Sequence, residues 1–352
     1  MKKKSLSVKR KKHNNFLLNK LRFLKIKKIY KELEKSLNIY LNEKKIAVGV
    51  SGGPDSLSLC YFTTCYALEH NIKVYFYIVD HKLRKNSTNE AVKVKSILSS
   101  LKSKCKILTW KGKKPKKNLQ SIARKNRYSL MEKQCKNDKI KTLLLGHHIE
   151  DLYENFFIRL SRGSGLNGLL SFYEIEKNIN KDLKILRPLI NQSKNDLIYT
   201  AKKVFNFYVK DPSNYNENFK RIRFRKLIYE IKKEGFDEKK FKLTLKNLKD
   251  SSESINYYVK KNISLNSIYS KKNSLYILNS KFFGEANEVV FRSFAKILTI
   301  AGGKYYNARG KSINLLIKKI KEKNFFKSTL SGCIIEKINN SIKIYRENNE
   351  KL

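Results

Sequence analysis

Acidic residues are scarce in this sequence. Asp and Glu number 30 against 78 Lys and Arg, so the formal net charge is +48. A chain this basic repels itself and attracts polyanions, which favours a nucleic acid as a partner. An AT-rich genome, which encodes neutral surface positions as Lys, Asn, Ile and Tyr, explains part of the size of the charge but less of its sign.

Cysteine is also sparse, and its spacing argues against two kinds of site. None of the five cysteines lies in a C-x-x-C pair. An odd count in a long chain argues against a disulfide framework and favours a reducing compartment. The spacing argues equally against a zinc or iron–sulfur site built from cysteine. The five are Cys60, Cys65, Cys105, Cys135 and Cys333.

Long apolar runs are missing too. No uninterrupted apolar stretch approaches the ~18 residues of a membrane helix, so no membrane partner is expected. Residues 1–40 form a basic extension in which no acidic residue precedes Glu32. Apolar residues at helical spacing predict that the extension is partly helical. A nucleic-acid-contacting arm, an organellar import segment and a solvated tail without a role all stay open for it.

From residue 41 to about residue 230, strand-like and helix-like segments alternate. The expected strands are Ile46–Val50, Val74–Val79, Cys105–Trp110 and Thr142–Leu145. The expected helices are Leu57–Glu69, Ser87–Leu101, Asn118–Cys135 and Glu150–Leu160. Apolar runs of this length are typical of strands buried on both faces. The alternation predicts an α/β fold with a doubly wound parallel sheet, which binds its ligand at the carboxyl ends of the strands.

The pattern changes near residue 230, where we place a domain boundary. Leu227–Tyr258 has a charged helical pattern, and a second helix is expected over Val289–Leu298. Cys333–Ile335 and Ser341–Tyr345 predict a β-hairpin with its turn at Asn339-Asn340. Residues 231–352 are therefore predicted to form a smaller helical or α+β module.

A glycine-rich turn follows the first expected strand and opens a helix. It reads Ser51-Gly52-Gly53-Pro54-Asp55-Ser56. A helix N-terminus offers unpaired N–H groups and partial positive charge, so the turn is a cradle for phosphate, although it is not a Walker A loop. Gly52 and Gly53 let a ligand approach the backbone. Asp55 would repel phosphate unless a cation lies between them, so a Mg²⁺-bound polyphosphate with Asp55 as metal ligand is implied.

This string resembles the S-G-G-x-D-S signature of the PP-loop, or N-type, ATP pyrophosphatases. Later stretches resemble one family among them, the tRNA(Ile)-lysidine synthetases, over about residues 41–347. These stretches are Asp80–Glu90, Ala123–Tyr128, Leu145–Glu154, Arg159–Leu166, Arg187–Leu189, Asp211–Asn214, Thr329–Cys333 and Tyr345–Glu347. Two positions depart from the family pattern: Ile222 stands where Asn is usual, and Ser331 where Gly is commoner.

The resemblance implies a ligase that uses ATP and Mg²⁺. It would join free L-lysine to C2 of the wobble cytidine in a CAU-anticodon tRNA(Ile) through an adenylated tRNA. Pyrophosphate and AMP would leave, and codon reading would change from AUG to AUA. Residues 41–230 would be the PP-loop ATP-binding catalytic domain, and residues 231–352 a tRNA-binding module. A 2-thiocytidine thiolase of the same superfamily is the alternative, disfavoured by the lack of a C-x-x-C pair, and a non-enzymatic tRNA-binding protein is a third.

Roles for single residues follow from the resemblance together with charge. His147, Asp151 and Glu154 are spaced to share one helix face. His147 is implied to lie at the nucleotide as a catalytic residue, and Asp151 and Glu154 to face the lysine, whose two ammonium groups need carboxylates. Acids in the first turn of an ordinary helix are the alternative interpretation.

Basic residues complete the expected site. Arg124 is assigned to catalysis at the ATP phosphates or to the tRNA backbone, because guanidinium groups bind phosphate bidentately. Asp80 and His81 end a strand at the ligand edge and are assigned to the nucleotide, with a structural role as the alternative. The residues expected to contact tRNA are Arg127, Arg221, Arg223 and Arg225.

Location and assembly are less defined. The cytoplasm is the expected compartment, with an organelle matrix or stroma as the alternative for an organelle-encoded chain. A homodimer stays an open option, because the sequence does not define the oligomeric state.

Overall fold

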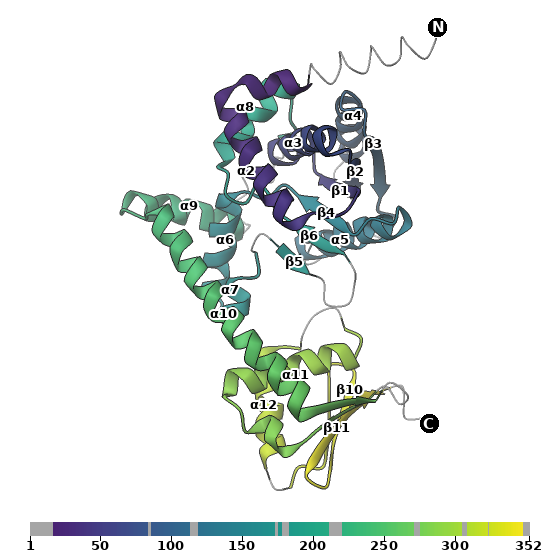
Figure 1. The fold of residues 1–352 in the computed structure, drawn as a ribbon, viewed down its shortest axis with the longest axis vertical. Coiled ribbons are helices and arrows are strands. Elements are labelled where there is room, and N and C mark those ends of the chain that lie inside the picture. Colours follow the sequence, from purple (N-terminus) through teal and green to yellow (C-terminus); the bar gives the residue numbers. More distant parts are fainter. Residues whose placement is uncertain are drawn as a thin grey trace. The chain divides into compact units, whose positions relative to one another are not determined.

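The computed structural model divides the chain into two compact units, Met1–Phe236 and Asp237–Leu352 (Figure 1). It describes residues 17–83, 86–112, 119–172, 175–177, 183–210, 220–270, 275–304, 308–322 and 324–347. The start of the basic extension, Arg84 and the Asp211–Asn214 motif lie outside these residues. Across the described segments, each helix is too short or too polar to cross a bilayer.

The first unit is built on a six-stranded sheet. In spatial order its strands are β3 (Lys104–Thr109), β2 (Lys73–Asp80), β1 (Lys45–Val50), β4 (Thr142–Leu145), β6 (Lys184–Leu186) and β5 (Ile175–Lys177). Neighbouring strands pair in parallel from β3 to β6, which confirms the predicted doubly wound sheet. The edge strand β5 is antiparallel to β6, and neither of these two short strands was predicted.

Helices cover both faces of this sheet. The helices of this unit are α2 (Leu24–Tyr40), α3 (Pro54–His70), α4 (Ser87–Ser99), α5 (Leu119–Asn137), α6 (Ile149–Leu160), α7 (Leu166–Leu169), α8 (Lys194–Phe205) and α9 (Lys220–Lys233), preceded by the 3₁₀ turn η1 (Lys20–Arg22). Successive residues of a strand point to opposite faces. Accordingly Ile46 and Val48 pack in one core with α2, α3, α4 and α8, whereas Ala47 packs in the other with α5.

Helix α2 belongs to the core of this unit, although its residues fall within the segment treated above as an extension. Its buried face carries Ile26, Leu33 and Leu37, each 0% exposed. These side chains lie in the same cluster as β1 and α3. The amphipathic spacing that predicted a helix therefore reflects packing against the sheet layer.

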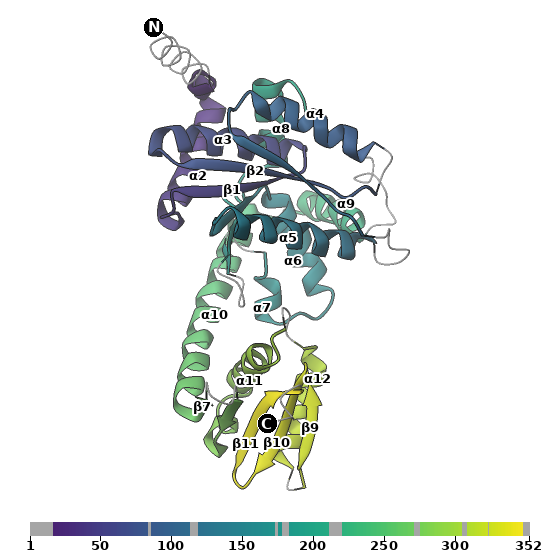
Figure 2. The same cartoon turned by 90° about the vertical axis from the view of Figure 1, so that its right-hand side faces the viewer.

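The second unit pairs an antiparallel sheet with helices (Figure 2). Its five strands lie in the order β7 (Ser267–Ser270), β8 (Leu275–Leu278), β11 (Ser341–Arg346), β10 (Cys333–Ile338) and β9 (Lys327–Leu330). Its helices are α10 (Glu238–Asn266), α11 (Asn287–Ala301) and α12 (Gly310–Lys321), with the 3₁₀ turn η3 (Ser280–Phe283). The predicted hairpin is confirmed as β10–β11, and its turn residue Asn339 has φ of 51°.

The segment Leu227–Tyr258, predicted to be helical, is divided between two helices, α9 and α10. The chain breaks after α9 at Gly235, whose φ of +88° is a left-handed conformation that favours glycine. Asp237 then starts α10, because its carboxylate accepts hydrogen bonds from the backbone of Lys239 and Lys240. The boundary between the two units falls at this break in the chain, whereas residue 230 lies inside α9.

Candidate active site

The glycine-rich turn lies at the switch point of the sheet, where β1 and β4 are neighbours but their connections run to opposite sides. Gly52 has φ of +82°, and a Cβ there would lie 2.6 Å from Val94 and 2.9 Å from Val209. Its carbonyl accepts a 2.9 Å hydrogen bond from the Val209 backbone. Glycine is therefore required both by conformation and by space.

Hydroxyl groups hold the turn in shape. The Ser51 backbone donates to Ser56 Oγ at 3.2 Å, and Ser56 Oγ donates to the Gly53 carbonyl at 3.0 Å. Helix α3 begins at Pro54. Gly53 precedes it and has no side chain with which to cap the helix. The N–H groups of the first turn are left for a ligand, as an anion cradle requires.

The loop after β4 packs directly on this turn. A Cβ at Gly146 would lie 2.9 Å from both the backbone carbon and oxygen of Asp55. This close approach brings the start of α6, with its acidic residues, against the start of α3. The predicted phosphate cradle and the predicted acidic cluster therefore share one site.

Two internal cations hold the carboxylates of this site. Lys194 Nζ lies 2.6 Å from Asp55 Oδ2. The buried His148 ring places Nδ1 2.8 Å from Glu150, and Nε2 lies 3.4 Å from Asp151 and 3.9 Å from Asp55. Burial raises the pKa of Asp55, and the charges of His148 and Lys194 oppose that shift.

The neighbouring histidines are driven in opposite directions. Burial lowers the pKa of His147 well below its ordinary value, and the charges of Arg187 and Arg127 act the same way. Burial acts to lower the pKa of His148 too, but Asp151 and Glu150 outweigh it and the pKa is raised. These shifts favour the neutral form of His147 and the protonated form of His148.

We expect these two rings to titrate differently. The ¹H–¹⁵N spectrum should show His148 losing its proton above pH 6.5, while His147 stays neutral there. Because the folded pKa of His148 is raised, its stabilising contribution is fully present below pH 6.5 and is lost as the pH rises through that folded value. Urea unfolding should thus show a loss of stability with rising pH that the His148→Asn variant lacks. Equal slopes in both proteins would contradict the charged imidazole.

A buried arginine fixes the orientation of His147. Arg187 is 0% exposed and donates from Nε to His147 Nδ1 at 3.2 Å. The Phe172 ring packs on both, with its centroid 4.8 Å from the guanidinium and 4.6 Å from the imidazole centroid. Because Nδ1 accepts, Nε2 of the neutral ring carries the proton and is a hydrogen-bond donor.

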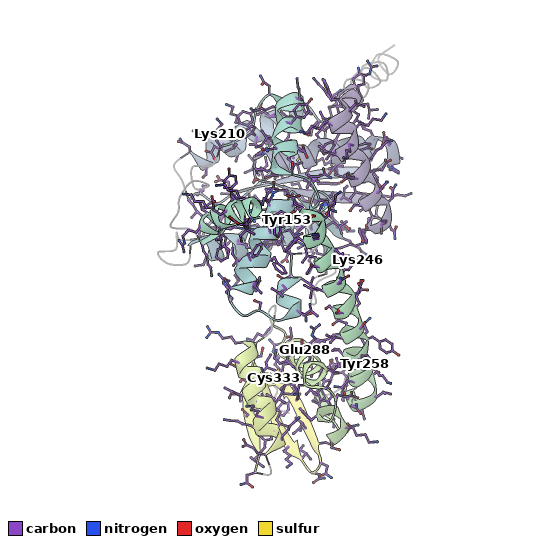
Figure 3. The ribbon with its side chains drawn as sticks, turned by 90° about the vertical axis from the view of Figure 1, so that its left-hand side faces the viewer. Tyr153, Lys210, Lys246, Tyr258, Glu288 and Cys333 are labelled. Carbon is purple, nitrogen blue, oxygen red and sulfur yellow. The ribbon has the colours of Figure 1, made fainter. Side chains whose placement is uncertain are left out.

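Glu154 is paired with two arginines from α9. Its side chain is 1% exposed, and Arg225 Nε and Nη2 both lie 2.7 Å from Oε1, while Arg221 Nε lies 3.0 Å from Oε2. Burial and the nearby Asp151 raise the pKa of Glu154 against these arginines. Burial acts to raise the pKa of Asp151 too, but His148 and Arg221 hold it well below its usual range. Tyr153, the residue before Glu154 on α6 (Figure 3), packs edge-on against Phe236.

The three α9 arginines expected to contact tRNA do not share one environment. Arg221 and Arg225 lie four residues apart and so face the same side, toward α6. Arg223 lies two residues from each and is exposed. Ile222, the departure from the family pattern, is half-buried on the same helix.

Helix α5 places Arg124 and Arg127 where their charges act on His147. Arg124 is exposed and donates to Tyr128 Oη at 3.2 Å. Arg127 is half-buried, and its pKa is lowered by burial and by the charges of Arg124 and Arg221. His81 has its pKa lowered by burial and by Arg127, and its buried Nδ1 has no hydrogen-bond partner in the described part of the chain.

Asp80 is engaged in local structure. Its carboxylate accepts hydrogen bonds from the side chains of Ser87 and Thr88 at 2.8 and 2.7 Å and from the Lys82 backbone at 3.0 Å. The carboxylate thereby joins the end of β2 to the start of α4. This geometry corresponds to the structural alternative for Asp80.

Three residues of the site were not assigned from the sequence. His148 and Arg187 lie inside stretches that match the family, so the signal was present but no role was given to them. Lys194 had no signal, because a single lysine among so many basic residues does not stand out. Its position is known only from the packing of α8 on α3.

Residues 23–231 match the PP-loop domain family. With the sheet and loop described above, this match places the chain in the class of PP-loop enzymes, which use ATP. Among curated relatives, the tRNA(Ile)-lysidine synthase of Rickettsia akari is 33% identical over 333 residues, covering 92% of this chain and 75% of the relative. That of the Wolbachia strain from Brugia malayi is 32% identical, covering 93% and 76%. The chain belongs to the tRNA(Ile)-lysidine synthase family, which confirms the resemblance inferred from the motifs.

A solved structure shares the fold. The U34-tRNA thiolase NcsA from Methanococcus maripaludis, with its [4Fe-4S] cluster, aligns with a TM-score of 0.55 and 20% identity. The alignment covers 65% of this chain and 80% of the thiolase. At this identity the likeness concerns the fold alone.

Proposed function

We propose that this protein attaches L-lysine to C2 of the wobble cytidine in a CAU-anticodon tRNA(Ile). The cytidine O2 attacks the α-phosphorus of ATP, the bond to the β-phosphate breaks and pyrophosphate leaves. The lysine ε-amine then attacks C2, and AMP leaves with the former O2. The attacking amine is in its neutral form, and its nitrogen loses one proton as the new C–N bond forms. Membership of the tRNA(Ile)-lysidine synthase family supports this reaction.

The observation that carries the proposal is the contact between the phosphate cradle and the acidic start of α6. Adenylation needs a site for polyphosphate, and the second step needs, within reach of it, a site for lysine and its ammonium groups. Gly146 packs on Asp55, so the two sites adjoin. The chain's task is mainly positioning and charge neutralisation.

The nucleotide is assigned to the Ser51–Ser56 turn. The free N–H groups of α3 would receive the phosphates. The Nε2 proton of His147, whose orientation Arg187 fixes, suits a phosphate oxygen as acceptor. Arg124 is exposed at the same side and is free of an ion pair among the described residues, so we keep it as a phosphate-contacting residue.

The residues present fit a divalent cation at Asp55. Asp55 Oδ1 is buried and has no hydrogen-bond partner in the described segments, so an oxygen is left for a metal. Such an ion, which we propose to be Mg²⁺, would supply charge neutralisation at the phosphates. Asp55 would hold it, and the second oxygen of Asp55 is held by Lys194.

The lysine substrate is assigned to Asp151 and Glu154. Asp151 stays ionised, because its pKa is held low, and its ion pair with Arg221 is long at 3.7 Å. Glu154 is already neutralised by two guanidinium groups at 3.0 Å or less. Asp151 is therefore the better placed of the two to receive an ammonium group, while Glu154 orients α9.

The tRNA is assigned to the basic surface of the chain. The formal charge of +48 provides attraction to phosphate, and Arg223 is an exposed cation on α9. The wobble base must leave its stack to reach the switch point. We propose that the second unit contacts the body of the tRNA, that the reaction takes place in the cytoplasm or in an organelle compartment, and that a homodimer is one option for assembly.

The thiolase alternative lacks a reactive thiol. Burial raises the pKa of Cys65 and Cys135 to about 12 and that of Cys105 and Cys333 to about 11. Burial also raises the pKa of the Cys60 thiol well above its ordinary value. A thiol that stays protonated is a poor nucleophile or persulfide carrier. Lysine transfer is the function that these side chains support.

The test uses the full chain, unmodified tRNA(Ile) with a CAU anticodon, ATP with Mg²⁺ and ¹⁴C-lysine. We expect label on the tRNA and one pyrophosphate released for each lysine attached. A tRNA with uridine at the wobble position is the control and should stay unlabelled. Folded protein that leaves the CAU tRNA unlabelled sinks the proposal, and sulfur transferred from a labelled donor would select the thiolase.

A further inference from the structure

Lys194 makes the shortest ion pair of the site. Its Nζ lies 2.6 Å from Asp55 Oδ2, at the place where the charge argument from the sequence requires a cation. The other oxygen of Asp55 is buried without a hydrogen-bond partner in the described residues. In the free protein, then, an ammonium group stands at the carboxylate that is expected to hold a divalent ion.

The backbone of Lys194 is held by hydrogen bonds between helices, whereas its side chain is partly exposed. The Lys194 N–H donates to the Glu150 carboxylate oxygens at 3.2 and 3.3 Å, which ties α8 to α6. Ser58 Oγ donates to the Leu197 carbonyl at 2.9 Å, which ties α8 to α3. The Lys194 side chain is 38% exposed, so its ammonium can leave Asp55 without moving the helix.

The positive charge of Lys194 lies at a helix end that favours negative charge. Lys194 is the first residue of α8, where the partial positive charge of the helix disfavours a cation. The contact with Asp55 offsets that cost. A charge kept against the preference of its own helix indicates a role outside the helix.

We propose that Lys194 is a substrate-positioning residue that serves as the counter-ion of Asp55 until ATP binds. When a divalent cation binds together with the nucleotide, the Asp55 carboxylate would bind that cation, and the Lys194 ammonium would move to the phosphates. The ammonium repels a bare divalent ion, so the free protein binds metal weakly and admits it together with phosphate. This rests on the proposed function only in taking metal-bound ATP as the substrate.

The test is a titration of the protein with Mn²⁺, read by the EPR signal of free Mn²⁺, without nucleotide. Lys194→Met is expected to bind Mn²⁺ at least tenfold more tightly than the wild type, and Lys194→Arg to resemble the wild type. Adding Asp55→Asn to Lys194→Met should remove the gain. Lys25→Met is the matched control. Lys25 lies on α2, and its Nζ pairs with Asp196 of α8 at 2.7 Å, so this ion pair involves α8 but not Asp55.

A second titration adds the ATP analogue AMPCPP. In the wild type the analogue should tighten Mn²⁺ binding strongly, and in Lys194→Met this tightening should fall at least tenfold. Melting temperatures identify a variant that fails to fold, and Lys194→Gln then replaces it. A folded Lys194→Met protein that binds Mn²⁺ no more tightly than the wild type overturns the proposal. Neither titration uses tRNA or lysine, so failed lysine transfer would count against the proposed function alone.

Discussion

Replacing Asp55 with Asn should lower pyrophosphate release from ATP in the presence of tRNA by roughly 100-fold or more. The substitution keeps the size of the side chain and removes its charge. Asp55 Oδ1 is the unpartnered buried oxygen beside the cradle, and Oδ2 holds Lys194. Without the carboxylate, the site loses its metal ligand and leaves Lys194 and His148 facing a neutral amide.

The matched control is Asp138→Asn. Asp138 follows α5 and accepts hydrogen bonds from Lys106, Tyr77 and Gln134, so it is an engaged carboxylate outside the site. We expect this variant to lose stability but to keep its rate of pyrophosphate release when folded. Release is followed with a coupled pyrophosphatase assay under saturating ATP. An Asp55→Asn protein that retains a tenth of the wild-type rate would show that Asp55 does not hold an essential metal.

The sequence predicted the parts of the fold that local pattern determines. Apolar runs gave β1 to β4, and the glycine-rich turn gave the start of α3. Strands β5 and β6 are three residues each and carry no periodic signal. The helical pattern over Leu227–Tyr258 did not show the break at Gly235, because the left-handed backbone conformation of that glycine is evident only in the structure.

The sequence was sufficient to name several residues of the site but not the contacts that these residues make. Asp55, His147 and Asp151 could be named, because each lies in a motif after a predicted strand. The partners of these residues come from elements distant in sequence: Lys194 from α8, Arg187 from the segment after β6, and the arginines from α9. A chain with 78 basic residues gives no local means of telling which cations are paired. Arg221, Arg223 and Arg225 thus read as one tRNA-binding cluster, whereas two of them pair with Glu154.

Replacing Arg221 and Arg225 together with Gln is expected to lower the free energy of unfolding by about 3 kcal/mol. Glu154 is 1% exposed and depends on these two guanidinium groups. Removing both leaves a buried carboxylate without compensation, which costs far more than losing a surface pair. Urea unfolding measures the change. Arg223→Gln, on the same helix but exposed, should stay within about 0.5 kcal/mol of the wild type.

Two further variants separate structure from tRNA contact. Glu154→Gln in the double-arginine background should restore most of the lost stability, because the uncompensated charge is gone. Arg223→Gln should weaken tRNA binding and reduce the salt dependence of that binding by about one unit of slope. A double-arginine variant as stable as the wild type would show that the ion pairs do not hold α9 on α6. The two arginines would then return to the tRNA-binding set, and Glu154 would be left unpaired to receive the lysine.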